Sequence, residues 1–332
     1  MALTDELAYH QRENPTNEVD VSFQNYVSNR SRKFERHLDG GIPDYAYSSD
    51  FTLRQKIKSI PGAYRFFKVF NSQVVPLMKQ KYNLSAAKVS SAQFPQIYEM
   101  AKSCASTLGI GIPSVYIEPN LGEMNAFTYA TEDAEPMIVI YSSMLERFSP
   151  EELKAIIGHE CGHIHNLHGV YNTAASVLLT SFQNTLLMSI PGIQQLLSLM
   201  SKPLEYALKA WNRAAEVTCD RAGIICAGEV DSSLSSQAKL MSGGILNQET
   251  LNIDELLKQY DVMRENPVRF YEWTMDHPLS VRRIMADKEF MNSQVFYDWH
   301  PEMKKPNMRL YTKQELDARC DNIISVTKSE KR

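Results

Sequence analysis

The spacing of apolar residues predicts helices in the first third of the chain. From residue 51 to 84, apolar positions recur among Lys and Arg, including Phe66, Phe67, Phe70 and Val74. This pattern predicts an amphipathic helix packed on the protein body, and a helix lying on a membrane surface is the alternative. A second helix is expected over 95–108, which opens with a proline and then follows three- and four-residue apolar spacing.

A small sheet is expected in the middle of the chain. Residues 115–117, 126–130 and 137–141 are short runs rich in β-branched and aromatic residues. The polar stretch 131–136 between the last two predicts a hairpin loop. Ser149 then stands as the N-cap of a strong helix start, with a proline next to it and a glutamate three residues on, which is the pattern of a capping box.

That helix contains a His-Glu-x-x-His motif, with His159, Glu160 and His163. Each residue turns a helix by about 100°, so the two histidines lie about 40° apart on one face and can present both imidazoles to one ion. Neutral imidazoles suit Zn²⁺, which lowers the pKa of a bound water toward about 7, and a nearby carboxylate can take the proton. The motif therefore predicts a zinc site with Glu160 as the base.

Three further residues that could bind a metal, two histidines and a cysteine, stand close to this motif. On one straight helix His165 and His168 fall about 140° and 160° from the middle of the metal-binding face, and Cys161 is also on the far side. We therefore expect all three to serve polar or core packing.

A third protein ligand must come from elsewhere in the chain. Glu216 and Asp220 are one helical turn apart and stand among alanines, which permit close helix approach. Glu216 can bind the metal while Asp220 accepts a hydrogen bond from the far nitrogen of a ligand histidine. Cys219 is the competing ligand, and we interpret it as packing.

These motifs, together with Asn125-Ala126-Phe127, His277-Pro278 and Arg283-Ile284, resemble the HtpX and CAAX prenyl protease family of gluzincin metallopeptidases. The resemblance covers about residues 93 to 288. It implies a zinc endopeptidase of the α+β class, with a mainly helical zincin-like domain and a small β-sheet. It also implies one Zn²⁺ held by His159, His163 and Glu216, with Glu160 as the catalytic base.

The resemblance assigns two further roles. Asn125, Ala126 and Phe127 would form the edge strand of the cleft, to which a peptide adds through main-chain hydrogen bonds. His277 would approach the scissile carbonyl and stabilise its oxyanion. A plain core strand and a histidine at a helix start are the alternatives.

The domain organisation follows from the extent of the resemblance. We expect an N-terminal helical extension over 1–90 that could cover the cleft, a metallopeptidase domain over 91–290 and a tail over 291–332. The apolar stretches within 174–200 are each shorter than the roughly 20 residues that cross a bilayer. They predict a helical hairpin inserted at 170–205, with membrane contact through 174–200 as the less favoured alternative.

Composition limits the partners and the location. The 332 residues carry 35 Lys and Arg against 39 Asp and Glu, a net charge of -4, so no nucleic-acid partner is expected. Five cysteines, an odd number, indicate a reducing compartment, and the first ten residues lack the apolar run of a signal peptide. We expect a cytoplasmic protein, or alternatively one peripheral on the cytoplasmic membrane.

The predicted function is zinc-dependent hydrolysis of peptide bonds in soluble or unfolded polypeptides. A membrane-associated quality-control protease is one alternative. A zinc-stabilised binding protein without catalytic activity is the other.

Overall fold

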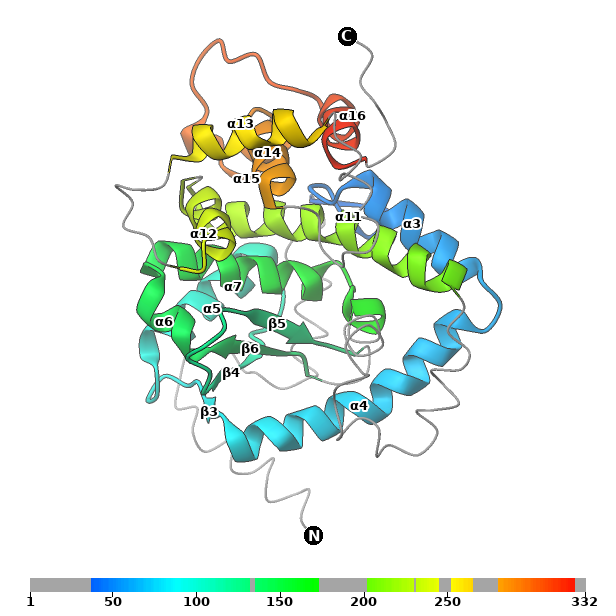
Figure 1. The fold of residues 1–332 in the computed structure, drawn as a ribbon, viewed down its shortest axis with the longest axis vertical. Helices are drawn as coiled ribbons and strands as arrows, with labels where there is room; N and C mark the ends of the chain where they lie inside the picture. The colour runs from blue at the N-terminus through cyan, green and yellow to red at the C-terminus, as the bar shows by residue number, and fades with distance from the viewer. Residues whose placement is uncertain are drawn as a thin grey trace.

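The computed structural model describes residues 37–131, 135–172, 202–229, 231–244, 252–264 and 280–325. Within them the protein is α+β and mainly helical, as predicted, with one four-stranded and one two-stranded sheet (Figure 1). The strands are β1 (Leu38–Asp39), β2 (Ile42–Pro43), β3 (Ala87–Lys88), β4 (Ser114–Glu118), β5 (Ala126–Tyr129) and β6 (Met137–Tyr141). The helices are α3 (Ser48–Ser59), α4 (Ala63–Ser85), α5 (Pro95–Leu108), α6 (Ser142–Arg147), α7 (Pro150–His165), α11 (Lys202–Ala227), α12 (Asp231–Met241), α13 (Ile253–Arg264), α14 (Ser280–Phe290), α15 (Gln294–Trp299), η4 (Pro301–Met303) and α16 (Lys313–Ile324).

The larger sheet has the strand order β3-β4-β6-β5, so β5 lies at its edge. β5 and β6 pair antiparallel, which confirms the predicted hairpin, whereas β4 and β6 run parallel. Both faces of the sheet are covered, because alternate residues of one strand enter different cores. Val115 and Ile117 join the cluster that includes α5 and α7, and Tyr116 joins the cluster that includes α4.

These layers are visible in Figure 1, where α4 lies on one side of the sheet and α7, followed by α11, lies on the other. α7 and α11 make the most extensive helix contact among the described elements. The sheet therefore supports α7 from one side while α11 packs on its other side.

The segment 51–84 differs in detail from its prediction. It contains two helices, α3 and α4, with a break at Gly62, which has a φ of 81°. The first helix ends before the extended Ile60, and Gly62 is the N-cap of α4, where its left-handed backbone is easy for glycine. Phe67 and Val74 are buried, as the amphipathic pattern predicts. The part of the predicted extension that the structure describes is thus packed into the core, and its possible role as a cleft cover stays a prediction.

The predicted helical hairpin at 170–205 falls almost entirely outside the described residues. Among the helices that the structure does describe, none combines the length and the apolar character needed to cross a membrane. All five cysteines are buried free thiols.

Candidate metal centre and catalytic cleft

The helix α7 begins at the predicted capping box and carries the His-Glu-x-x-His motif near its end. The Ser149 hydroxyl accepts a hydrogen bond from the Glu152 N–H, and the Glu152 carboxylate accepts one from the Ser149 N–H. Pro150 occupies the start of the helix. Two backbone donors that would otherwise lack partners are satisfied, so the start of the helix is well defined.

Small residues bring α7 and α11 into backbone contact. A Cβ added at Gly162 would lie 2.8 Å from the Cβ of Ala222, and one added at Gly158 would lie 2.5 Å from the Cβ of Cys226. Across the same interface, a Cβ at Gly223 would lie 2.7 Å from the carbonyl oxygen of Ala155. Larger side chains do not fit, and this close approach puts the middle of α11 opposite the two histidines.

The structure brings the three predicted ligands together. The Nε2 of His159 lies 3.5 Å from one carboxylate oxygen of Glu216, and the Nε2 of His163 lies 3.6 Å from the other. Two atoms bound to one tetrahedral zinc at about 2.0–2.1 Å are about 3.4 Å apart. The two imidazoles and the carboxylate therefore fit one metal ion, both in residue type and in spacing.

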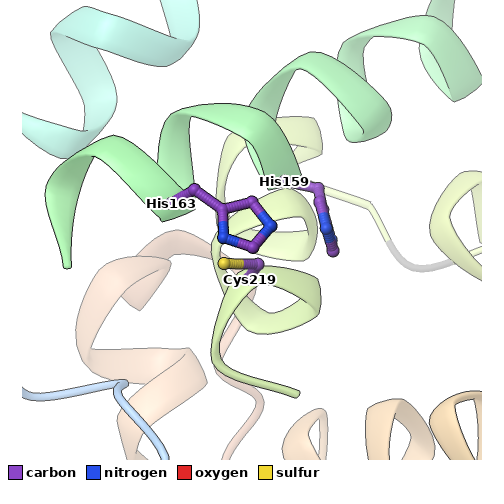
Figure 2. A group of neighbouring side chains, drawn as sticks. All are labelled: His159, His163 and Cys219. Carbon is purple, nitrogen blue, oxygen red and sulfur yellow. The ribbon is translucent and has the colours of Figure 1, made fainter. Parts of the chain in front are cut away.

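Cys219 is the competing ligand, and its sulfur lies on another side of His163. Figure 2 shows the sulfur beside the His163 ring, and ligand atoms of His159, His163 and Cys219 all lie within 4.8 Å of one another. However, the Cys219 sulfur is 3.5 Å from the Nδ1 of His168, and this same nitrogen is 3.2 Å from the Nδ1 of His163. Burial, together with the negative charge of Glu216, raises the pKa of the Cys219 thiol well above its ordinary value. The Cys219 sulfur therefore lies on the Nδ1 side of His163, whereas the Glu216 carboxylate faces the Nε2 atoms of both histidines.

Asp220 and Arg283 contact the predicted ligands His159 and Glu216 and hold them in place. Asp220 lies 2.9 Å from the Nδ1 of His159, and Arg283 donates to both oxygens of Asp220 at 2.7 and 2.5 Å. Arg283 also lies 3.1 Å from Glu216. Burial alone would raise the pKa of Asp220, but the charge and hydrogen bonds of Arg283 and the hydrogen bond with His159 outweigh it and lower that pKa. Asp220 is thus an acceptor that fixes the His159 ring with Nε2 facing Glu216.

The same carboxylates act on His159 itself. Burial disfavours its charged form, yet the hydrogen bond with Asp220 and the charges of Glu216 and Asp220 raise its pKa overall. These groups stabilise positive charge at this position, whether it is carried by a proton or by a metal ion.

Glu160 is buried beside the ligands and is held by a residue of β5. The Thr128 hydroxyl donates a hydrogen bond to the Glu160 carboxylate at 2.7 Å. Burial raises the pKa of Glu160, while the charge of His159 and the Thr128 hydrogen bond partly oppose this rise. A carboxylate with a raised pKa is suited to proton transfer near neutral pH.

These groups line a cavity of about 580 Å³ between α7, α11, α12 and β5. Its wall includes the three residues predicted for the edge strand, Asn125, Ala126 and Phe127. Among the described strands β5 pairs with β6 alone, so its other edge has no strand partner there. The helix α4, which lies upstream of the predicted peptidase domain, adds Met78, Lys81 and Tyr82 to the wall.

The remaining predicted residues have other surroundings. His277 lies outside the described residues, and its oxyanion role stays a prediction. His165 shares a hydrogen bond with the Tyr45 hydroxyl, and Cys161 packs in the main core, so both serve packing as expected. His168 is not on α7, because this helix ends at His165; the chain turns back and places the His168 ring against His163. The straight helix assumed for His168 was therefore wrong.

For two residues of the site, the sequence did not fix a role. Thr128 could have been found, because it alternates with Ala126 on a strand and so shares its face. Arg283 is in a motif that we quoted, but its pairing with two carboxylates of α11 depends on how α14 packs on α11.

Known proteins show similarity to this part of the chain. The profile of Peptidase family M48 matches residues 91–290. The chain is 28% identical over 259 residues to the plastoglobule-localized metallopeptidase 48, chloroplastic, of Arabidopsis thaliana, which covers 75% of this chain and 73% of that protein. It is 25% identical over 179 residues to a Protease HtpX homolog of Bifidobacterium longum, covering 48% of this chain and 58% of that protein. It is 31% identical over 140 residues to Protease HtpX of Pseudomonas paraeruginosa, covering 36% of this chain and 48% of that protein.

The chain thus spans about half the length of the two HtpX relatives and about three quarters of the plant relative. The family match covers more than half of the chain and contains the His-Glu-x-x-His helix, the Glu216 helix and Arg283. This protein belongs to peptidase family M48 and is a metallopeptidase.

Proposed function

We propose that this metallopeptidase is a zinc-dependent endopeptidase, with His159, His163 and Glu216 as zinc ligands and Glu160 as general base. The observation that carries the proposal is the Glu216 carboxylate, whose two oxygens lie 3.5 and 3.6 Å from the Nε2 atoms of the two histidines. Two imidazoles and one carboxylate, with a fourth position left for water, form a known ligand set of catalytic zinc.

The chemistry divides between the ion and the protein. A zinc ion held by His159, His163 and Glu216 would supply a water of lowered pKa and would polarise the substrate carbonyl. Glu160 accepts the proton of the attacking water and delivers it to the leaving amine. Thr128 keeps the Glu160 carboxylate oriented during both proton transfers. Burial raises the pKa of Glu160 and so brings it nearer to neutral pH.

The edge of β5 supports a polypeptide substrate. An extended peptide can add to this edge through main-chain hydrogen bonds, which do not depend on its sequence. A folded protein offers few extended segments whose backbone groups are still available for pairing. We therefore propose soluble or unfolded polypeptides as the substrate class, bound with chain on both sides of the cleaved bond.

The test uses Glu160→Gln in the full-length chain, with a denatured protein as substrate and elemental analysis for zinc. We expect unchanged zinc content and a loss of cleavage of at least about 100-fold, the usual scale of general acid–base catalysis. The matched control is Glu151→Gln, an exposed position on the same helix, which should leave cleavage unchanged. A Glu160→Gln variant as active as the wild type would eliminate Glu160 as the base.

The ligand assignment is tested by Glu216→Ala and Cys219→Ser. Glu216→Ala should lower zinc content, whereas Cys219→Ser should keep it. The opposite result would make Cys219 the third ligand.

A further inference from the structure

The chain turns sharply where α7 ends. Leu167 has a φ of 59°, a left-handed conformation that is unfavourable for leucine, and its side chain is 42% exposed. The N–H of His168 then donates to the carbonyl of His163 at 2.9 Å. Leu167 itself buries little of its side chain in this conformation. The turn instead places the side chain of His168 in the protein interior, where it is 0% exposed.

A continuous hydrogen-bonded chain runs from this histidine in two directions. Its Nδ1 lies 3.2 Å from the Nδ1 of His163, and its Nε2 lies 2.8 Å from a carboxylate oxygen of Asp50 on α3. Asp50 also accepts hydrogen bonds at 2.9 Å from the Trp211 indole and the Thr218 hydroxyl. We name the first three residues the Asp50–His168–His163 chain.

For a neutral His168, its hydrogen-bond partners determine where each proton lies. An ionised carboxylate only accepts hydrogen bonds, so the Nε2 of His168 must donate to Asp50. The Nδ1 of a neutral His168 is then an acceptor, and the Nδ1 of His163 must donate to it. With its proton on Nδ1, His163 presents an unprotonated Nε2 toward Glu216, which is the form a metal requires.

The opposite arrangement shows why the direction matters. If the Nδ1 of His168 carried a proton, the Nδ1 of His163 would have to accept it. The proton of a neutral His163 would then lie on Nε2, where it would block the metal. The Cys219 thiol, 3.5 Å from the Nδ1 of His168, is a weak donor and is compatible with an accepting nitrogen there.

We infer that Asp50 and His168 are positioning residues for the metal centre, which hold His163 in the tautomer and ring orientation that bind the ion. This inference rests on the proposed role of His163 as a ligand. Each ligand histidine then has its own carboxylate: Asp220 acts on His159 directly, and Asp50 acts on His163 through His168. Asp50 lies upstream of the family match at 91–290, so the N-terminal segment supplies part of the metal centre.

The decisive substitution is Asp50→Asn, which keeps the size of the side chain and changes the hydrogen-bond pattern. Trp211 donates to one oxygen of Asp50 and therefore selects the amide oxygen of the asparagine. The amide NH₂ then faces His168, whose Nε2 must accept, and its proton moves to Nδ1. Outer partners of metal-binding histidines contribute about 10–100-fold to metal affinity, and we expect a loss of Zn²⁺ affinity in this range.

The matched control is Asp44→Asn. Asp44 also lies in the N-terminal segment and also pairs with a histidine and a tryptophan, His37 and Trp299, each at 2.8 Å. It has no contact with the Asp50–His168–His163 chain. Zn²⁺ affinity is measured on the full-length proteins by competition with a chromophoric chelator, after circular dichroism and thermal unfolding of the metal-free forms. Asp44→Asn should bind Zn²⁺ within twofold of the wild type.

A second measurement reads the histidine tautomers in the unsubstituted protein. Long-range ¹H–¹⁵N NMR spectra of the wild type report the tautomer of each histidine, and assignment by single His→Gln variants identifies the signals. We expect His168 with its proton on Nε2 and His163 with its proton on Nδ1.

The outcomes are distinguishable. A protonated Nδ1 on His168, unchanged Zn²⁺ affinity in Asp50→Asn, or an equal loss in Asp44→Asn would each overturn the inference. If His163→Ala binds Zn²⁺ as tightly as the wild type, the proposed function fails first. If His163→Ala loses Zn²⁺ and Asp50→Asn does not, the inference alone fails.

Discussion

Arg283 is the cation that holds the two carboxylates of α11, and its removal should destabilise the protein strongly. Arg283→Gln eliminates two hydrogen bonds to Asp220 and the ion pair with Glu216. It leaves two buried carboxylates one helical turn apart without their counter-charge. Removal of one partner of a buried ion pair costs about 3–5 kcal/mol of unfolding free energy, and we expect a loss of this size in the metal-free protein.

The loss should depend on pH in a defined direction. Burial opposes ionisation of Asp220, but Arg283 and His159 together hold its pKa below the ordinary value of 3.8. A pKa lowered by folding gives stability that is present above the unfolded pKa and disappears as pH falls through the folded pKa. The difference between the wild type and Arg283→Gln should therefore be largest at neutral pH and should shrink below about pH 4.

The assay is urea unfolding followed by circular dichroism, in the presence of a chelator, at pH 7 and at about pH 3, which is below the ordinary pKa of an aspartate. Arg319→Gln is the control, because Arg319 is an exposed arginine paired with Glu289 at 3.3 Å, and such surface pairs contribute about 0–1 kcal/mol. A loss below about 1 kcal/mol for Arg283→Gln, or a loss of equal size at both pH values, would refute the reasoning.

Two further predictions concern the base and the helix contact. Thr128→Val removes the hydrogen bond that lowers the pKa of Glu160, so the acid limb of the kcat/KM profile should move to higher pH; an unmoved limb would contradict the role of Thr128. Gly162→Ala pushes a Cβ against Ala222, which should cost about 1–3 kcal/mol of unfolding free energy and weaken Zn²⁺ binding. Gly122→Ala, with its nearest neighbour atom at 3.8 Å, should change neither quantity, and similar losses in both variants would argue against a specific helix contact.

Elements that depend on nearby residues could be predicted from the sequence. The capping box at Ser149 and the helix that begins at Pro95 were confirmed because their signals lie within a few residues. The break at Gly62 was missed, although a proline and a glycine mark it in the sequence. There the amphipathic pattern continues across the break, so periodicity alone could not reveal it.

In the site, too, features set by nearby residues could be predicted, and features set by tertiary packing could not. The place of Glu216 beside the two histidines could be predicted, because the expected zinc site needs a third ligand and a carboxylate pair stands one turn apart on a helix. The contacts of Arg283 and Asp50 could not be fixed from the sequence, because each residue comes from a separate element and reaches the site only through tertiary packing. Thr128 could have been found from its alternation with Ala126 on β5. His168 was placed wrongly, because its position depends on a single left-handed residue, Leu167, that ends the helix.

Because α7 and α11 are in backbone contact, the spacing of the metal-binding residues and the shape of the cavity depend on different positions of the chain. The distance from His163 to Glu216 depends on positions that have almost no side chain, namely Gly162 and Ala222, and substitution there can only force the helices apart. The cavity wall, in contrast, is built from full side chains such as Met78 and Leu240, which stand on other helices. Substitutions in the cavity wall can therefore change which substrates bind while the distance between His163 and Glu216 stays the same. Substrate preference and the geometry of the metal centre can change independently of each other.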